Sequence, residues 1–245
     1  MAGDARDERM RSREETRHDT VLLDVDGTLV DSTYHHALAW HRAFRQHDIS
    51  LPMWRVHRSI GMGGDRLVGV LAGDDVEQRI GDELRSAWHE EYAKLADEVE
   101  PLPGAADLVR TLSRRFTVAL GSSGKPEFTR QAVDLVGVRD DVAVVTTSED
   151  APSSKPAPDI LEIALQKSGG RSAIVIGDST FDVSSAARMG APCVAIRTGG
   201  FGADELRDAG AVLVARGLPD LLDADWDKLA RMQPPPGASD EPPLP

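Results

Sequence analysis

The chain of 245 residues has little cysteine, few aromatic residues and no long hydrophobic run. Its one cysteine, Cys193, excludes a disulfide within the chain and lies in an apolar stretch that favours a buried thiol over a nucleophile. No apolar run reaches the ~18 residues that a membrane-spanning helix needs. The sequence therefore predicts a globular protein without a membrane partner, and a cytoplasmic location is the default expectation.

Positive charge is also scarce, since 28 Lys and Arg residues stand against 41 Asp and Glu residues and give a net charge of −13. A chain this acidic is not expected to bind nucleic acid, because its overall field repels a phosphate backbone. Ten of the acids lie between residues 74 and 100, and salt screens charges beyond about 10 Å. A local site for an anionic ligand elsewhere in the chain therefore remains compatible with this composition.

The two ends of the chain lack hydrophobic periodicity. Residues 1–17 mix Arg with five acids and contain no apolar core of a signal peptide, so we expect a disordered leader. Residues 233–245 are rich in proline and are likewise expected to be an unstructured tail. The segment between them is long enough to bury a full core.

Two carboxylates follow the first strand-like run, Val21-Leu22-Leu23, in the string Asp24-Val25-Asp26-Gly27-Thr28. Residues two apart in an extended segment point the same way, so both carboxylates can face one group. Two negative charges this close need a cation beside them. A hard, oxygen-binding ion such as Mg²⁺ fits this requirement.

Three further strings lie near the ends of other predicted elements. Gly121-Ser122-Ser123 follows the β-rich run 116–120, where hydroxyls and backbone N–H groups can cradle a phosphate. The serine-hydrolase motif Gly-x-Ser-x-Gly is excluded, because Lys125 stands where its second glycine belongs. Lys155 precedes a predicted helix in the string Lys155-Pro156-Ala157-Pro158-Asp159.

The last string, Gly177 to Asp182, follows the apolar run 173–176, which is typical of a buried strand. If a helix begins near Thr180, Asp182 lies in its first turn while Asp178 stays at the strand end. The two carboxylates can then converge on one cation. Asp182 alone would also suit the positive end of a helix dipole.

Together these strings resemble the haloacid dehalogenase superfamily of aspartyl phosphotransferases, over roughly residues 18–232. The resemblance implies that Asp24 is the nucleophile and Asp26 the general acid and base. It implies that Ser122, with the adjacent Ser123, and Lys155 bind the phosphoryl group. It also implies Mg²⁺ bound by Asp24, the carbonyl of Asp26 and Asp178, with Asp182 as a further ligand, directly or through water.

The resemblance further implies an α/β fold, a three-layer Rossmann-like parallel sheet of strand order 3-2-1-4-5. About ninety residues separate the first string from the second, which is too long for a simple crossover. Helical patterns at 33–47 and 76–96 predict an inserted α-helical cap domain over residues 33–98, with the core at 18–32 and 99–232. His36 and Gly64 are the candidate cap residues for contact with substrate.

These expectations indicate a Mg²⁺-dependent phosphatase of a small phosphorylated metabolite, such as a sugar phosphate, a polyol phosphate or phosphoglycolate, in a monomer or homodimer. A phosphosugar mutase is the alternative, although Gly64 stands about where such mutases carry an Arg that grips the distal phosphate. A phospho-receiver switch or a binding protein is the alternative from another class. A receiver is about half this length and lacks the Asp-x-Asp-Gly-Thr string. A binding protein that had kept the fold without catalysis would be expected to have lost one of the core site residues, and all of them are present.

Overall fold

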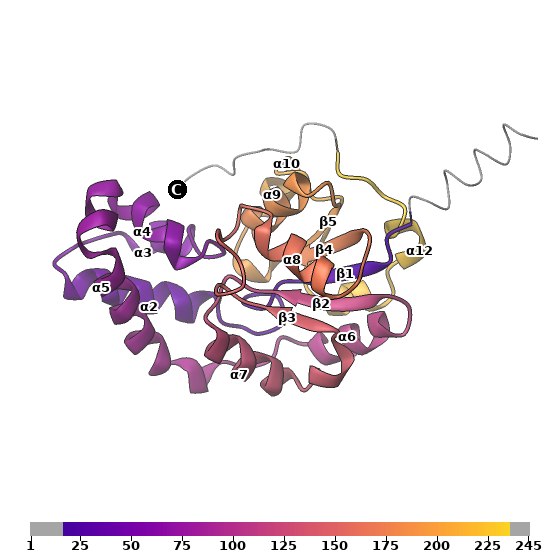
Figure 1. Cartoon of the computed structure of the whole chain (residues 1–245), viewed down its shortest axis with the longest axis horizontal. Coiled ribbons are helices and arrows are strands. Elements are labelled where there is room, and N and C mark those ends of the chain that lie inside the picture. The colour runs from indigo at the N-terminus through magenta and orange to yellow at the C-terminus, as the bar shows by residue number, and fades with distance from the viewer. Residues whose placement is uncertain (1–16, 236–245) are drawn as a thin grey trace, which may run out of the picture.

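The computed structural model describes residues 17–235 and contains one six-stranded parallel sheet (Figure 1). Most of the predicted leader (1–17) and tail (233–245) lies outside the described residues. The strands are β1 (Thr20–Leu23), β2 (Thr117–Gly121), β3 (Val144–Thr146), β4 (Ala173–Gly177), β5 (Cys193–Ile196) and β6 (Leu213–Ala215). Their order is β3-β2-β1-β4-β5-β6, so the predicted order holds for five strands and β6 extends one edge.

Helices follow most of the strands and cover both faces of the sheet. They are α6 (Ala105–Ser113), α7 (Pro126–Val136), α8 (Asp159–Lys167), α9 (Thr180–Arg188), α10 (Ala203–Asp208), α11 (Pro219–Leu222) and α12 (Trp226–Leu229). Short 3₁₀ turns lie at Ala96–Glu98, Arg139–Asp141 and Arg197–Gly199. This arrangement confirms the predicted three-layer α/β fold.

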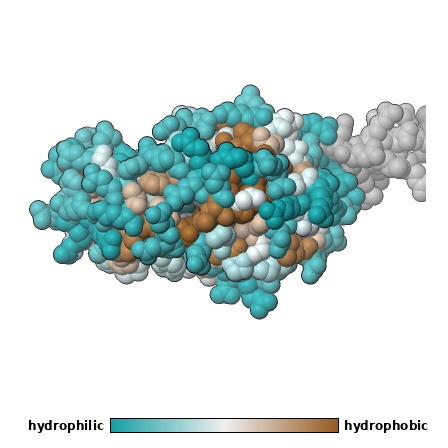
Figure 2. Space-filling view, turned by 90° about the horizontal axis from the view of Figure 1, so that it is seen from below, coloured by the Kyte–Doolittle hydropathy of each residue, from teal (hydrophilic) through white to brown (hydrophobic). Residues whose placement is uncertain are grey.

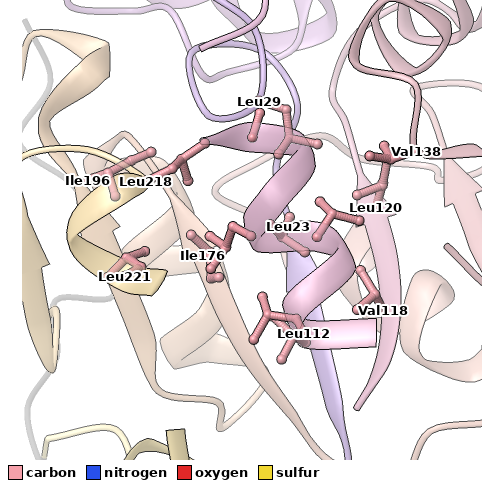
Figure 3. Packing of buried hydrophobic residues seen from close by; sticks show 14 of the residues in the cluster. Leu23, Leu29, Leu112, Val118, Leu120, Val138, Ile176, Ile196, Leu218 and Leu221 are labelled. Atoms are coloured by element: carbon pink, nitrogen blue, oxygen red, sulfur yellow. The ribbon is translucent and has the colours of Figure 1, made fainter. Parts of the chain in front are cut away.

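The alternation of side chains along each strand creates two separate hydrophobic clusters. Val21 and Leu23 of β1 point to the face that is covered by α6, α7, α11 and α12. Leu22 points to the opposite face, which is covered by α8, α9 and α10. Figure 3 shows the first cluster, where Leu112 of α6 lies close to the side chains of the central strands. Both faces are buried, as expected of a parallel sheet.

Four helices fill the stretch between β1 and β2: α2 (Thr33–Gln46), α3 (Met53–His57), α4 (Gly64–Ala72) and α5 (Asp74–Ala93). They enclose a third hydrophobic cluster of their own, which includes Phe44, Leu67 and Leu84. The two predicted helices correspond to α2 and α5, although α5 begins earlier than expected and has a non-helical residue at Ile80. We call these four helices the helical insertion; its standing as a separate cap domain remains a prediction.

The helical insertion lies beside the sheet in Figure 1 and is hydrogen-bonded to loops of the rest of the chain. The amide of Gly63 donates to Ser154 Oγ at 3.0 Å, and the amide of Ser154 donates to Asp65 Oδ2 at 3.1 Å. His57 Nε2 lies 2.9 Å from the carbonyl oxygen of Gly199. The loop 61–65 is therefore joined directly to the segment that precedes Lys155.

The surface seen in Figure 2 is mostly hydrophilic, with hydrophobic residues visible in its middle. Within residues 17–235, we find no helix that combines the length and the apolar character needed to cross a membrane.

Candidate active site

The parallel register brings the ends of three strands to one edge of the sheet. Leu23 of β1 pairs with Leu120 of β2 on one side and with Ile176 of β4 on the other. The chain leaves these strands at neighbouring points, and the residues that follow them are Asp24, Ser122 and Asp178. Ligand sites of open parallel sheets lie at this carboxyl edge. The strings that the sequence singled out are therefore brought together, although they span more than 150 positions.

Lys155 connects two of these strings through its buried ammonium group. The side chain is 1% exposed, and Nζ forms an ion pair with Asp24 Oδ1 and another, at 2.7 Å, with Asp182 Oδ1. Burial alone lowers the pKa of Lys155, but the Asp182 and Asp24 carboxylates outweigh it and raise this pKa above its ordinary value. Lys155 therefore stays charged, as a fixed cation beside the predicted nucleophile.

Three buried carboxylates gather around that single cation. Oxygen atoms of Asp24, Asp178 and Asp182 all lie within 4.8 Å of one another. Burial, with the neighbouring charges of Asp182 and Asp26, raises the pKa of Asp24 to about 7 although Lys155 opposes the shift. Burial and the same kind of repulsion also raise the pKa of Asp178. The cluster thus lacks positive charge, and its all-oxygen donor set fits a hard divalent cation such as Mg²⁺.

The position of Asp178 depends on two glycines that leave room for its carboxylate. A Cβ atom on Gly27 would lie 2.3 Å from Asp178 Oδ2, and one on Gly199 would lie 2.0 Å from the same oxygen. Gly27 also has a φ of +80°, which side-chain-bearing residues rarely adopt. The hydroxyl of Thr28 donates to Asp178 Oδ1 at 3.0 Å. The Gly-Thr pair of the first string therefore holds the carboxylate that ends the fourth strand.

Asp182 lies in the first turn of α9, as predicted, and has structural partners as well. Its Oδ2 accepts hydrogen bonds from the amide and the hydroxyl of Ser179, in the capping box of the helix. Its Oδ1 faces Lys155. The carboxylate can therefore hold Lys155 in place and also lies within reach of a bound cation.

Asp26 has different surroundings from Asp24. Its Oδ1 accepts from Ser32 Oγ at 2.8 Å and lies 3.0 Å from His36 Nε2, and its Oδ2 accepts from Ser122 Oγ at 3.2 Å. Burial raises the pKa of Asp26, but the attraction of His36 and the three hydrogen bonds outweigh it and lower this pKa. The two neighbouring carboxyls therefore have pKa values shifted in opposite directions, as expected of groups with separate roles.

His36 belongs to α2 of the helical insertion, whereas Asp26 belongs to the loop after β1. The imidazole stacks on Tyr92 with ring centroids 3.9 Å apart and planes 3° from parallel. It also lines the cavity described below. The sequence marked His36 for contact with substrate; in the structure its Nε2 is already engaged with Asp26. His36 is thus a candidate positioning residue, and a direct substrate contact remains a prediction.

The two serines after β2 differ in their partners. Ser122 Oγ is engaged with Asp26 and accepts from the amide of Gly124 at 2.9 Å. Ser123 Oγ is buried, has no hydrogen-bond partner among the described residues, and belongs to a residue that lines the cavity. Of the two predicted phosphate-binding serines, Ser123 has the free hydroxyl.

A cavity of about 220 Å³ opens beside Asp24 and Asp26, between the sheet edge and the helical insertion. Gly64 lines it, and a Cβ atom there would meet Trp40 at 3.0 Å, so any side chain would press on this ring. Trp40, Arg85 and Ser148 also line the cavity and were not expected from the sequence. Arg85 could have been found from its position three residues before Trp88, on the same helix face; nothing in the sequence marks Ser148.

Comparison with known proteins agrees with this arrangement. Residues 18–190 match a family model described as a haloacid dehalogenase-like hydrolase. Among curated relatives, the chain is 25% identical to a fructose-1-phosphate phosphatase from Escherichia coli over 74% of this chain and 97% of the relative. It is 29% identical to phosphoglycolate phosphatase 1 from Pseudomonas aeruginosa over 82% of this chain and 78% of the relative.

Solved structures share the fold over nearly their whole length. A hydrolase from Pseudomonas syringae superimposes with a TM-score of 0.79 at 31% identity, covering 83% of this chain and 96% of the other. A beta-phosphoglucomutase from Clostridium difficile gives a TM-score of 0.75 at 16% identity, covering 87% and 97%, which shows the fold alone. Because the matched family model spans most of the chain, including Asp24, Lys155 and Asp178, this protein belongs to the haloacid dehalogenase-like hydrolases.

Proposed function

We propose that this protein is a Mg²⁺-dependent phosphatase of a small phosphorylated metabolite that acts through an aspartyl-phosphate on Asp24. One observation carries the proposal: Asp24 and Asp26 line the same cavity, and only Asp24 is paired with the buried Lys155. This gives one carboxylate beside a fixed cation and a second one held by neutral and imidazole donors. The matched curated relatives, several of which are named as phosphatases, support the same activity.

In the first step, an oxygen of Asp24 attacks the phosphorus of the substrate. The bond between phosphorus and the leaving oxygen breaks, and Asp26 gives its proton to that oxygen, so that an alcohol departs. The lowered pKa of Asp26 belongs to the protein without substrate. A substrate phosphoryl group brings negative charge beside Asp26, which raises the pKa of this carboxyl and favours the protonated form.

In the second step, water attacks the phosphorus of the aspartyl-phosphate. Asp26, now a carboxylate, takes a proton from the water, the bond from phosphorus to the Asp24 oxygen breaks, and inorganic phosphate leaves. The hydrogen bonds from Ser32, His36 and Ser122 hold Asp26 in place for both proton transfers. Because the acid and the base are one residue, each turnover restores the starting state.

Lys155 offsets the charge that gathers where the phosphoryl group meets Asp24. Asp24, Asp178 and the carbonyl of Asp26 would hold Mg²⁺, which when bound neutralises charge on the phosphoryl oxygens. We further propose that the helical insertion acts as a cap that excludes water during the first step. The proposal keeps the expectation of a cytoplasmic monomer or homodimer without a nucleic-acid partner.

The test is the hydrolysis of 4-nitrophenyl phosphate by purified protein with Mg²⁺, with excess EDTA, and with the variant Asp24→Asn. We expect EDTA and the variant each to abolish release of inorganic phosphate. Asp31→Asn is the matched control, because it makes the same change at an exposed acid seven positions away. Full activity of Asp24→Asn would sink the mechanism. Interconversion of hexose phosphates without phosphate release would instead favour the mutase.

A further inference from the structure

One cation of the cavity that receives the leaving group, Arg85, already has carboxylate partners. Arg85 of α5 lines it, and its Nη1 lies 2.8 and 3.1 Å from the two carboxylate oxygens of Glu77. Its Nη2 donates to Asp82 Oδ1 at 2.8 Å, and Nη1 also donates to the carbonyl of Gly64 at 3.1 Å. Most of the guanidinium donors are therefore occupied within the helical insertion. The partly buried Glu77 offsets most of the positive charge, and Asp82, whose side chain is 99% exposed, offsets less of it because solvent screens the pair.

The other cation that lines the cavity is Lys125, at the start of α7. Among residues 17–235 its ammonium is in no ion pair, but two further acids, Asp65 and Glu149, line the same cavity. Asp65 Oδ2 accepts from the neutral amide of Ser154, and none of residues 17–235 places a cation in an ion pair with it. Apart from Asp24 and the Asp26–His36 pair, two lining acids and the two acidic partners of Arg85 stand against the two cations Arg85 and Lys125.

Three further polar groups of the cavity wall are neutral, and His36 is engaged with Asp26. Ser123 Oγ, Ser148 Oγ and Trp88 Nε1 belong to lining residues, are buried, and have no hydrogen-bond partner among the described residues. Buried polar groups are normally hydrogen-bonded, so these three point to a polar ligand that supplies the missing partners. Hydroxyl groups suit them, because a hydroxyl can accept from serine or indole and donate to a carboxylate such as Asp65.

An apolar wall completes the cavity. The rings of Trp40 and Trp88 stack with centroids 5.4 Å apart and planes 19° from parallel, and Ile60 and Met62 lie with them along the cavity. A flat aromatic surface favours the C–H face of a carbon chain or ring, whose hydroxyls point elsewhere. A second phosphate or a carboxylate would be placed among more acids than bases and would lose its hydration there.

We propose that the leaving group of the substrate is uncharged and carries several hydroxyls, as in a monophosphorylated sugar or polyol, and that the cavity selects against a second anionic group. The inference rests on the proposed phosphatase function and narrows it. Phosphoglycolate and bisphosphates are therefore expected to be poor substrates, because their second negative charge would lie near the acids of the cavity. The selection is electrostatic: Glu77 imposes most of it by neutralising Arg85, and the exposed Asp82 adds to it.

Two matched substrate pairs test the proposal with purified full-length protein and Mg²⁺. Fructose 1-phosphate is compared with fructose 1,6-bisphosphate, and glycerol 3-phosphate with 3-phosphoglycerate, so that the members of each pair differ by one distal anion. We expect kcat/KM to be at least about tenfold higher for the uncharged member of each pair. Each compound is also measured as a competitive inhibitor of 4-nitrophenyl phosphate hydrolysis, so poor substrates are ranked by their inhibition constants.

A pair of variants tests the cause. The double variant Glu77→Gln, Asp82→Asn releases the charge of Arg85 and should reduce the preference for the uncharged member at least threefold. The control Asp204→Asn, Asp220→Asn removes the same charge elsewhere. Asp204 of α10 pairs with Arg207 and Asp220 of α11 pairs with Arg216, and neither helix contributes a residue to the cavity wall. It should leave the preference unchanged.

Equal or better use of the anionic members by the wild-type protein would overturn the proposal. If Lys125→Ala then abolished that preference, Lys125 would be identified as an anion receptor instead. If both double variants reduced the preference equally, the role of Glu77 and Asp82 would be refuted, since the net charge of the protein alone would then explain the preference. Failure of the phosphatase function is distinguishable, because 4-nitrophenyl phosphate itself would not be hydrolysed.

Discussion

The hydrogen bond between His36 and Asp26 can be removed with little change in shape. In His36→Phe, a phenyl ring replaces an imidazole that stacks on Tyr92 with planes 3° from parallel, so the stacking is kept. The substitution deletes the contact between Nε2 and Asp26 Oδ1, which is 3.0 Å long. It therefore tests whether a residue of the helical insertion sets the protonation and position of the acid and base.

The size of the effect follows from the partners. A hydrogen bond to a charged group contributes about 1.5–3 kcal/mol, and each 1.36 kcal/mol of barrier is tenfold in rate. We therefore expect kcat to fall by roughly 10- to 150-fold while KM changes little. Because His36 lowers the pKa of Asp26, its removal should raise this pKa. Loss of 4-nitrophenolate needs little help from an acid, so the second step, in which Asp26 must be ionised to act as the base, sets the acid limb of the kcat–pH profile, and this limb should move to higher pH.

The assay is the kcat–pH profile for 4-nitrophenyl phosphate with Mg²⁺ at saturating substrate. His35→Phe is the matched control, since it makes the same substitution at the neighbouring position of α2, and it should keep the wild-type profile. A His36→Phe enzyme with unchanged kcat and an unchanged acid limb would refute the positioning role. A loss of activity with an unshifted profile would mean that only packing was disturbed.

Three further outcomes follow from the structure. Burial raises the pKa of Asp24 from 3.8 to about 7, so between these pH values the folded metal-free protein binds more protons than the unfolded chain. Its free energy of unfolding therefore falls as the pH rises from about 4 to about 7. Mg²⁺ should thus raise Tm more at pH 8 than at pH 5, and equal shifts would contradict the cation site. Lys155→Met leaves the buried carboxylates of Asp24 and Asp182 without their cation. It should lower the free energy of unfolding in urea, without Mg²⁺, by about 3–5 kcal/mol, whereas Lys167→Met at an exposed lysine should lower it by under about 1 kcal/mol. Leu84→Ala, at a side chain that is 0% exposed, should cost about 2–5 kcal/mol and the half-exposed Leu135→Ala much less; similar costs would contradict the packing of the helical insertion.

The fold was readable from the sequence because its signals are local. Val21-Leu22-Leu23 and the run 173–176 have strand character, and each ends at an acid and a turn. The residues that follow each strand can therefore be predicted from the local sequence alone, without tertiary contacts. The order of the strands came from the resemblance to a family, and β6 was missed because Leu213–Ala215 is a short strand at the sheet edge.

The contacts between distant strings could not be read in the same way. Nothing in the sequence shows that Lys155 is shared between Asp24 and Asp182, or that Ser122 faces Asp26 while Ser123 keeps a free hydroxyl. These outcomes depend on side-chain directions at the ends of three strands. Directions of this kind are fixed only when the loops pack against one another.

By itself, the sequence determined the chemistry: an acid pair at the end of the first strand, a lysine, and an acid at the end of the fourth. Spacing within a few residues is enough for that, because strand and helix periodicity place such neighbours. Only the tertiary structure decided that His36 of the helical insertion holds Asp26, and that Arg85 enters the cavity already neutralised by Glu77. The charge offered to a substrate is a sum over residues brought close by folding, and no local pattern contains that sum.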